Sequence, residues 1–204
     1  LDRNIPLWFG NVFEAGLLGQ SSFFPRNTEP AVANRPLITS PADMPAVLDL
    51  KNNSFLDMVK DFYATIKGLV GNEFRVIFPR WFRGPQGVAL YVRGFQNFLL
   101  DLYTAPDFAH TLLGSVTEAA QTYEKWRAEY LAEPLQPGDL FNDDLPLMSP
   151  ADYKAFIFPY EKALAHFYGS IYYYHSCGDL TKHLEQITAL NPILLIDLGV
   201  GMED

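Results

Sequence analysis

Apolar residues recur at helical spacing along much of the chain and predict five helices. The clearest helix follows Thr104 and ends before Pro134, and its stripe is Phe108, Leu112, Val116, Ala119, Tyr123 and Tyr130. The same spacing marks residues 55–66, 88–102, 153–167 and 183–190. The tetrapeptide Ser-Pro-Ala-Asp occurs at 40–43 and again at 149–152. Each copy offers a capping serine, a proline in the first turn and a carboxylate at the positive helix end, so we expect a helix to begin at both.

Short apolar runs of strand length separate these helices, at residues 5–9, 74–79, 139–142, 170–174 and 192–198. Strands that alternate with helices favour right-handed crossovers and a parallel sheet. The run Ile193-Leu194-Leu195-Ile196 is continuous, which is typical of a strand buried on both faces. A complete (β/α)8 barrel takes roughly 250 residues. We therefore expect residues 1–204 to form a single α/β domain, a TIM barrel that lacks its last strands.

Polar residues gather just after the strands, on the carboxyl side of the sheet, where parallel α/β proteins form their sites. They are Asn11 and Glu14, then Arg80 and Arg83, then Asp143 and Asp144, then His175 and Cys177, and finally Asp197.

The charge and composition exclude several classes of protein. The net charge is -9 and the basic residues form no run, so we expect no nucleic-acid partner. No apolar stretch approaches the roughly 18 residues of a membrane span. Cys177 is the only cysteine, which excludes an internal disulfide and fits a cytoplasmic location.

His175 and Cys177 are separated by one residue at the end of a predicted strand. Because strand side chains alternate, both point to the same side. Imidazole and thiolate are natural zinc ligands, and a catalytic zinc takes three protein ligands and keeps one open position. A third ligand must then come from elsewhere in the chain. The alternative is a buried histidine beside an inert cysteine.

Two further segments carry candidate chemistry. Asp143 and Asp144 repel one another unless a cation, a proton or a donor relieves them, so they could hold a metal or act as acid and base; the alternative is an exposed turn. Arg80 and Arg83 flank Trp81 and could bind carboxylates or phosphates; the alternative is a surface arginine stacked on Trp81.

The order of several motifs resembles the uroporphyrinogen decarboxylase superfamily. The matching segments are Gly84-Pro85, Arg93-Gly94, Asp101 to Asp107, the stretch from Asn142 through Met148-Ser149-Pro150 to Tyr160, and His175-Ser176-Cys177-Gly178. The resemblance covers most of residues 75–200 and, more faintly, the first 50 residues. It implies a (β/α)8 barrel of the uroporphyrinogen decarboxylase type, with the site at the carboxyl ends of the strands and an apparently incomplete C-terminus.

Two branches of this superfamily are relevant. The decarboxylases use no metal, and their arginine-rich Arg-x-x-Gly-Arg motif is missing from residues 11–19. The other branch resembles cobamide-dependent methyltransferases, which bind zinc through a His-x-Cys pair and a later cysteine. His175 and Cys177 match that pair, so we expect zinc, and a corrinoid that carries the methyl group to or from a thiol or small methylated substrate. The later cysteine would lie beyond residue 204, unless Glu14, Asp143 or Asp144 replaces it.

The methyltransferase hypothesis assigns roles to the remaining candidates. Its catalytic carboxylates are Asp143, Asp144 and Glu14, and its substrate-binding residues are Arg80, Arg83, Trp81, Asn11 and Tyr160. A corrinoid carrier protein is the expected partner. One alternative is a metal-free tetrapyrrole decarboxylase that uses Arg80, Arg83 and Asp143. Others are a non-catalytic or truncated relative and an unrelated α/β protein with a structural cysteine.

Overall fold

The protein is a mixed α/β structure, seen in a computed structural model that describes residues 3–44, 48–190 and 192–197. Its strands are β1 (Asn4–Pro6), β2 (Ser22–Phe23), β3 (Ala31–Val32), β4 (Arg75–Ile77), β5 (Gly138–Phe141), β6 (Ile171–His175) and β7 (Ile193–Asp197). Its α-helices are α1 (Phe13–Leu17), α2 (Ser54–Val70), α3 (Pro85–Arg93), α4 (Phe95–Thr104), α5 (Pro106–Leu131), α6 (Pro150–Asp152), α7 (Phe158–Tyr168) and α8 (Leu184–Thr188).

Five of the strands pair in parallel with their neighbours, as the alternation of helices and strands predicts. β1 pairs with β4, and β5, β6 and β7 form a second sheet in that order. Beyond β4 the chain runs beside β5, where the amide of Phe141 donates to the Phe82 carbonyl and that of Gly84 to the Phe141 carbonyl, each at 2.8 Å. Within the described residues these strands form two parallel sheets, bridged at Arg83 and Phe141 into one open layer, and not a closed barrel.

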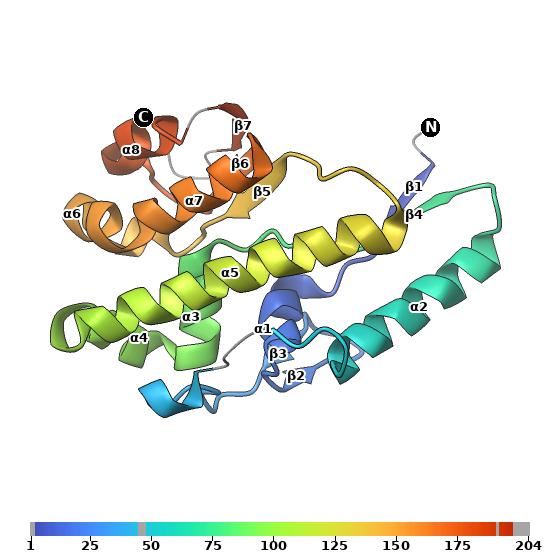
Figure 1. Cartoon of the computed structure of the whole chain (residues 1–204), viewed down its shortest axis with the longest axis horizontal. Helices are drawn as coiled ribbons and strands as arrows, with labels where there is room; N and C mark the ends of the chain where they lie inside the picture. The colour runs from blue at the N-terminus through green and yellow to red at the C-terminus, as the bar shows by residue number, and fades with distance from the viewer. Residues whose placement is uncertain (1–2, 45–47, 191, 198–204) are drawn as a thin grey trace.

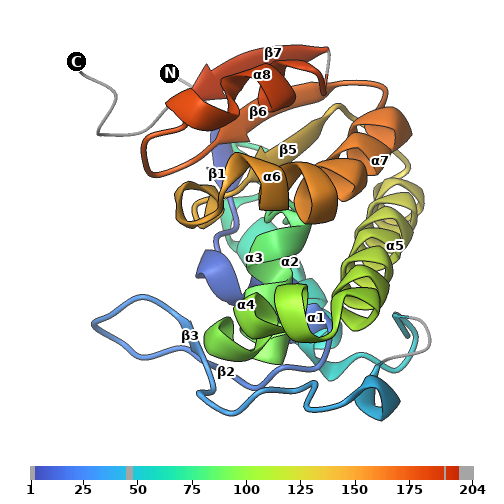
Figure 2. The same cartoon turned by 90° about the vertical axis from the view of Figure 1, so that its left-hand side faces the viewer.

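The helices cover one side of this sheet and enclose the core. In Figure 1, α5 crosses the molecule between α7 on one side and α2 on the other. Figure 2 shows β5, β6 and β7 side by side, with α7 packed against one face. The predicted stripe on α5 is confirmed at Leu112, Val116, Ala119 and Tyr123, which are buried, whereas Tyr130 is half exposed. None of the described helices has the length and apolar character of a membrane span.

Two predicted helices are interrupted. The expected helix over residues 88–102 is two helices, α3 and α4, because Gly94 between them has a φ of +86° that ends the first. The expected helix after Ser40 is a single 3-10 turn, Pro41–Asp43. Its next residue, Met44, is extended, and Met44 precedes a proline, which disfavours helical geometry.

The second Ser-Pro-Ala-Asp copy does begin a helix, because Ser149 Oγ accepts the Asp152 amide at 3.1 Å. That helix contains a π-helical turn over Tyr153–Ile157 before α7 continues it. The sequence pattern gave no sign of this turn.

The prediction that the last strand is buried on both faces is wrong for the described residues. Leu194 and Leu195 of β7 are 63% and 51% exposed, because β7 lies at the edge of its sheet. The predicted strand end at Leu198 lies outside the described residues. The small hairpin of β2 and β3 was not predicted, since each strand has only two residues.

Candidate functional site

The candidate site lies where β5, β6 and β7 end side by side. The strand register places Phe141 beside His175, and His175 beside Asp197. Asn142 and Asp143 follow β5 directly, and Cys177 lies two residues beyond His175. The parallel sheet therefore gathers an imidazole, a thiol and carboxylates at one edge.

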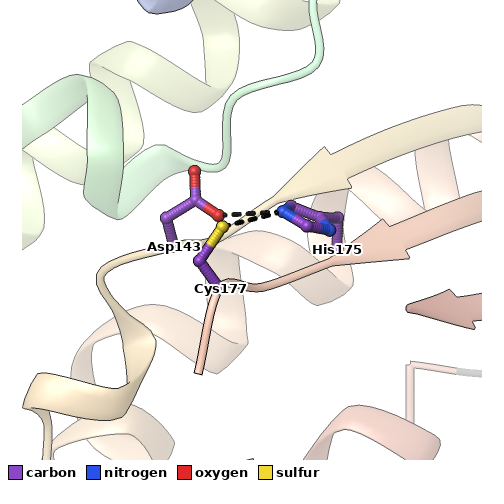
Figure 3. A group of neighbouring side chains, drawn as sticks. All are labelled: Asp143, His175 and Cys177. Atoms are coloured by element: carbon purple, nitrogen blue, oxygen red, sulfur yellow. Dashed lines mark hydrogen bonds and ion pairs between the residues drawn. The ribbon is translucent and has the colours of Figure 1, made fainter. Parts of the chain in front are cut away.

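Asp143, His175 and Cys177 form one compact cluster. Their ligand atoms all lie within 4.8 Å of one another. His175 Nε2 is 3.1 Å from Cys177 Sγ and 3.2 Å from Asp143 Oδ1. Figure 3 shows Asp143 and Cys177 facing the same end of the His175 ring from the loops after β5 and β6. His175 and Cys177 do point to the same side, as strand alternation predicts, and Asp143 is the carboxylate that joins them.

The other ring nitrogen of His175 contacts Asp197, a residue that the sequence analysis predicted at a strand end but gave no role. His175 Nδ1 is 3.0 Å from Asp197 Oδ2, and the Tyr173 hydroxyl donates to the same oxygen. This hydrogen bond raises the pKa of Tyr173 to about 12, so the phenol keeps its proton near neutral pH.

The charge environment of Cys177 disfavours a free thiolate. A hydrogen bond to Asp143 raises the pKa of the Cys177 thiol, and partial burial and two nearby carboxylates raise it further. A nucleophilic cysteine needs the opposite environment, one that lowers the pKa of its thiol. This environment therefore disfavours Cys177 as a free thiolate nucleophile near neutral pH.

Asp144 does not face the cluster. Its Oδ2 pairs with Arg83 Nη2 at 2.9 Å, and Gln86 donates to its carbonyl. Burial raises the pKa of Asp144, and the Arg83 guanidinium opposes that rise. Arg83 is itself almost fully buried, stacks over the Tyr91 ring at 4.4 Å and lies 3.8 Å from Asp143 Oδ2. Arg83 thus links the two aspartates.

Glu14 and Trp81 are part of the interior. Glu14 Oε1 accepts the backbone amides of Phe82 and Arg83 at 2.9 and 3.0 Å, and burial raises the pKa of its carboxyl group. Trp81 is 1% exposed, and its indole donates to the Arg83 carbonyl. The side chains of both residues therefore form hydrogen bonds with the backbone that follows β4.

The remaining predicted residues lie away from the cluster. Arg80 Nη1 pairs with Asp139 at 3.3 Å, and its Nη2 donates to the Pro137 carbonyl. The Tyr160 hydroxyl on α7 donates to the His110 carbonyl at 2.9 Å. Asn11 is exposed in the 3-10 turn Gly10–Val12.

A buried polar network that sequence reasoning missed supports the loop before Asp143. Glu161 of α7 accepts a hydrogen bond from Asn142 Nδ2 at 2.7 Å and another from the Tyr153 hydroxyl at 2.6 Å. The Tyr174 hydroxyl also donates to it, at 3.4 Å. Burial raises the pKa of Glu161 to about 7. Glu161 sits in a helical stretch, and its sequence neighbours gave no signal of burial.

Known proteins resemble the chain in sequence. Residues 4–202 match the profile of the family described as uroporphyrinogen decarboxylase (URO-D). A uroporphyrinogen decarboxylase from Thermodesulfovibrio yellowstonii is 26% identical over 172 residues, which cover 78% of this chain and 48% of that protein. One from Prochlorococcus marinus is 27% identical over 137 residues, which cover 62% and 38%. The chain thus spans about half the length, or less, of these relatives.

A solved structure shares the fold. A methyltransferase from Methanosarcina mazei superposes with a TM-score of 0.70 at 18% identity, over 92% of this chain and 55% of that one. The profile match covers nearly the whole chain. The chain therefore belongs to the uroporphyrinogen decarboxylase family.

Proposed function

We propose that Asp143, His175 and Cys177 hold a zinc ion and that this site serves methyl transfer between a corrinoid and a thiol or small methylated substrate. The observation that carries the proposal is the convergence of the three side chains on one point at the carboxyl ends of the strands. The whole protein's partner in this proposal is a corrinoid carrier protein.

The donor set suits zinc. Zinc binds thiolate, imidazole and carboxylate at about 2.0–2.3 Å, so neighbouring ligand atoms in a tetrahedral site lie roughly 3.3–3.8 Å apart. The distances of 3.1 and 3.2 Å around His175 Nε2 fall just short of that range, so the side chains would need to move apart by only a few tenths of an ångström to bind zinc. Asp143 Oδ1 is buried, and although His175 Nε2 lies 3.2 Å from it, this oxygen has no partner with hydrogen-bond geometry among the described residues. A cation would supply what this oxygen lacks.

The zinc ion and the side chains around it would have different roles in this reaction. Zinc held in a three-ligand site keeps an open position and lowers the pKa of a thiol bound there, which makes that thiol a nucleophile near neutral pH. Cys177 would release its proton on binding, since only the thiolate is a ligand. Asp143 would then turn from a hydrogen-bond acceptor of the thiol into a ligand. Arg83, 3.8 Å from its other oxygen, would keep that carboxylate in place.

The comparisons support this function in part. The structural neighbour is a methyltransferase, and its likeness concerns the fold. The sequence relatives are decarboxylases, so decarboxylation of a tetrapyrrole is the second candidate. That reaction would use Arg80 and Arg83 to hold substrate carboxylates, yet Arg80 pairs with Asp139 and Arg83 with Asp144. These internal pairs favour the metal site.

Elemental analysis tests the proposal directly. The protein, purified without chelator, should contain one zinc per chain, and Cys177→Ser, His175→Ala and Asp143→Asn should each lose it. His166→Ala is the matched control, because His166 is exposed on α7 and should leave the zinc content unchanged. The zinc-loaded protein should also transfer methyl from methylcob(III)alamin to 2-mercaptoethanol, forming the thioether and cob(I)alamin. A folded protein without zinc, or one that decarboxylates porphyrinogens in the presence of chelator, would overturn the proposal.

A further inference from the structure

The contacts of the second ring nitrogen of His175 assign a role to Asp197 and Tyr173. We propose that Asp197, oriented by Tyr173, is a positioning residue that keeps the His175 proton on Nδ1 and leaves the lone pair of Nε2 facing Asp143 and Cys177. This inference rests on the proposed metal site, but it concerns the protein before any metal binds.

The pairing of β6 with β7 fixes the geometry. His175 and Asp197 are partners in the strand register, and the Ser176 amide donates to the Asp197 carbonyl at 3.3 Å. The carboxylate is therefore brought to the ring by the backbone and not by a flexible loop. Asp197 Oδ2 lies 3.0 Å from His175 Nδ1.

Tyr173, which lies beside the His175 ring, orients the same carboxylate. Tyr173 and His175 lie on one face of β6, two positions apart, and their rings stack at 6.1 Å with an angle of 22°. The Tyr173 hydroxyl donates to Asp197 Oδ2. One carboxylate oxygen thus accepts from both side chains, and both hold the Asp197 carboxylate in place.

The proton assignment follows from the chemistry of the partners. Both ring nitrogens lie near a carboxylate, but only Nδ1 meets its carboxylate, Asp197 Oδ2, with hydrogen-bond geometry; Nε2 approaches Asp143 Oδ1 at 3.2 Å without forming a hydrogen bond to it. An ionised carboxylate only accepts hydrogen bonds, so the hydrogen of the neutral ring lies on Nδ1. In the neutral ring the other nitrogen, Nε2, is then an acceptor. It faces Cys177 Sγ at 3.1 Å and Asp143 Oδ1 at 3.2 Å. An unconstrained imidazole favours the opposite tautomer, with the hydrogen on Nε2, which cannot bind a metal there. Asp197 therefore preorganises the ligand.

The tautomer can be read in the metal-free protein. Long-range ¹⁵N–¹H NMR spectra at pH 8, with His175→Ala to assign the signal among the four histidines, should show a protonated Nδ1 and a bare Nε2. Asp197→Ala should shift the ring toward the Nε2-protonated tautomer, and Tyr173→Phe should shift it less. A bare Nδ1 in the wild-type protein would overturn the inference without any variant.

Metal affinity gives the second readout. Competition with a chromophoric chelator measures the affinity for zinc and for cobalt(II). The cobalt(II) protein also has a thiolate-to-metal absorption band that reports binding by Cys177. Asp197→Ala should bind both ions about 10- to 100-fold more weakly than the wild type. Asp179→Asn is the matched control: Asp179 is also near Cys177 in the chain, but it is exposed and accepts the Thr181 amide instead. It should bind zinc as the wild type does.

The outcomes separate the two proposals. A wild type that shows the Nδ1 tautomer yet binds no zinc would refute the metal site and leave the role of Asp197 standing. Zinc affinity that is equal in the wild type and in Asp197→Ala, or that falls equally in Asp179→Asn, would refute the role of Asp197. Urea unfolding of each metal-free variant checks that the fold is retained.

Discussion

The buried carboxyl group of Glu161 should make the stability of this protein fall as the pH rises. Burial raises the pKa of Glu161 from 4.5 to about 7, although Asn142 and Tyr153 both donate to its oxygens. The folded state then holds a proton that the unfolded chain releases at lower pH. This contribution to stability is complete below about pH 4.5 and is lost as the pH rises through about 7.

The magnitude follows from the two pKa values. Between pH 5 and pH 8 the linkage relation gives a loss of about 2 to 3 kcal/mol in the free energy of unfolding from this one group. Such a loss is a large share of the stability of an ordinary domain. Burial also raises the pKa values of Glu14 and Glu124, so these two residues should add to the same slope.

Urea unfolding at pH 5, 6, 7 and 8 measures this loss. Glu161→Gln keeps the size of the side chain and cannot titrate, so the variant should lose about 2 to 3 kcal/mol less than the wild type over this range. Glu118→Gln is the matched control, because Glu118 is exposed on α5 and should leave the slope unchanged. The same decline in Glu161→Gln and in the wild type would show that Glu161 does not hold the proton.

Three further predictions concern other parts of the chain. In chelator, Asp143→Asn should speed the alkylation of Cys177 by iodoacetamide at pH 7.5, because the Asp143 carboxylate raises the pKa of that thiol; an unchanged rate would contradict the assignment. Gly138→Ala should lower the free energy of unfolding in urea by about 1–3 kcal/mol, because the new Cβ would lie 2.2 Å from the Tyr168 ring. Gly68→Ala is the control: Gly68 is exposed on α2 with open space around it, so this variant should be more stable by roughly 0.5–1 kcal/mol. Asn53→Ala should lower thermal stability by about 1–2 kcal/mol, because its side chain caps α2 at 2.9 Å; no change in melting temperature would count against the cap.

Elements whose signals are local in the sequence could be predicted. The helical stripe of α5, the strand before His175 and the shared side of His175 and Cys177 all depend on residues a few positions apart. The break at Gly94 had a visible cause in its glycine, yet the apolar pattern continued across it. Local periodicity does not reveal whether a glycine adopts a positive φ.

The partners of the candidate residues could not be predicted, because they depend on strand register and burial. Asp197 meets His175 across 22 positions only because β6 and β7 pair in one register. Glu14 was predicted to be a catalytic carboxylate, but its Oε1 accepts hydrogen bonds from two backbone amides that lie 68 and 69 positions away in the sequence. Trp81 was predicted to bind substrate, but it is buried in the core. Residue type and position after a strand identify the edge of the site but not which side chains face it.

The π-helical turn at Tyr153–Ile157 amounts to a one-residue insertion in an otherwise regular helix. In a regular α-helix, residues eight positions apart point about 80° away from one another, whereas residues seven apart nearly coincide. The extra residue lets Tyr153 and Glu161 face the same way and form their 2.6 Å hydrogen bond. Regular α-helical winding over the same number of residues would turn the tyrosine about 80° away from the carboxyl group, whereas deleting one residue together with the turn would leave the two side chains seven positions apart and still nearly aligned. Relatives without the turn should therefore fall into two groups: those one residue shorter in this segment can keep the tyrosine–glutamate pair, and those of the same length should lack it.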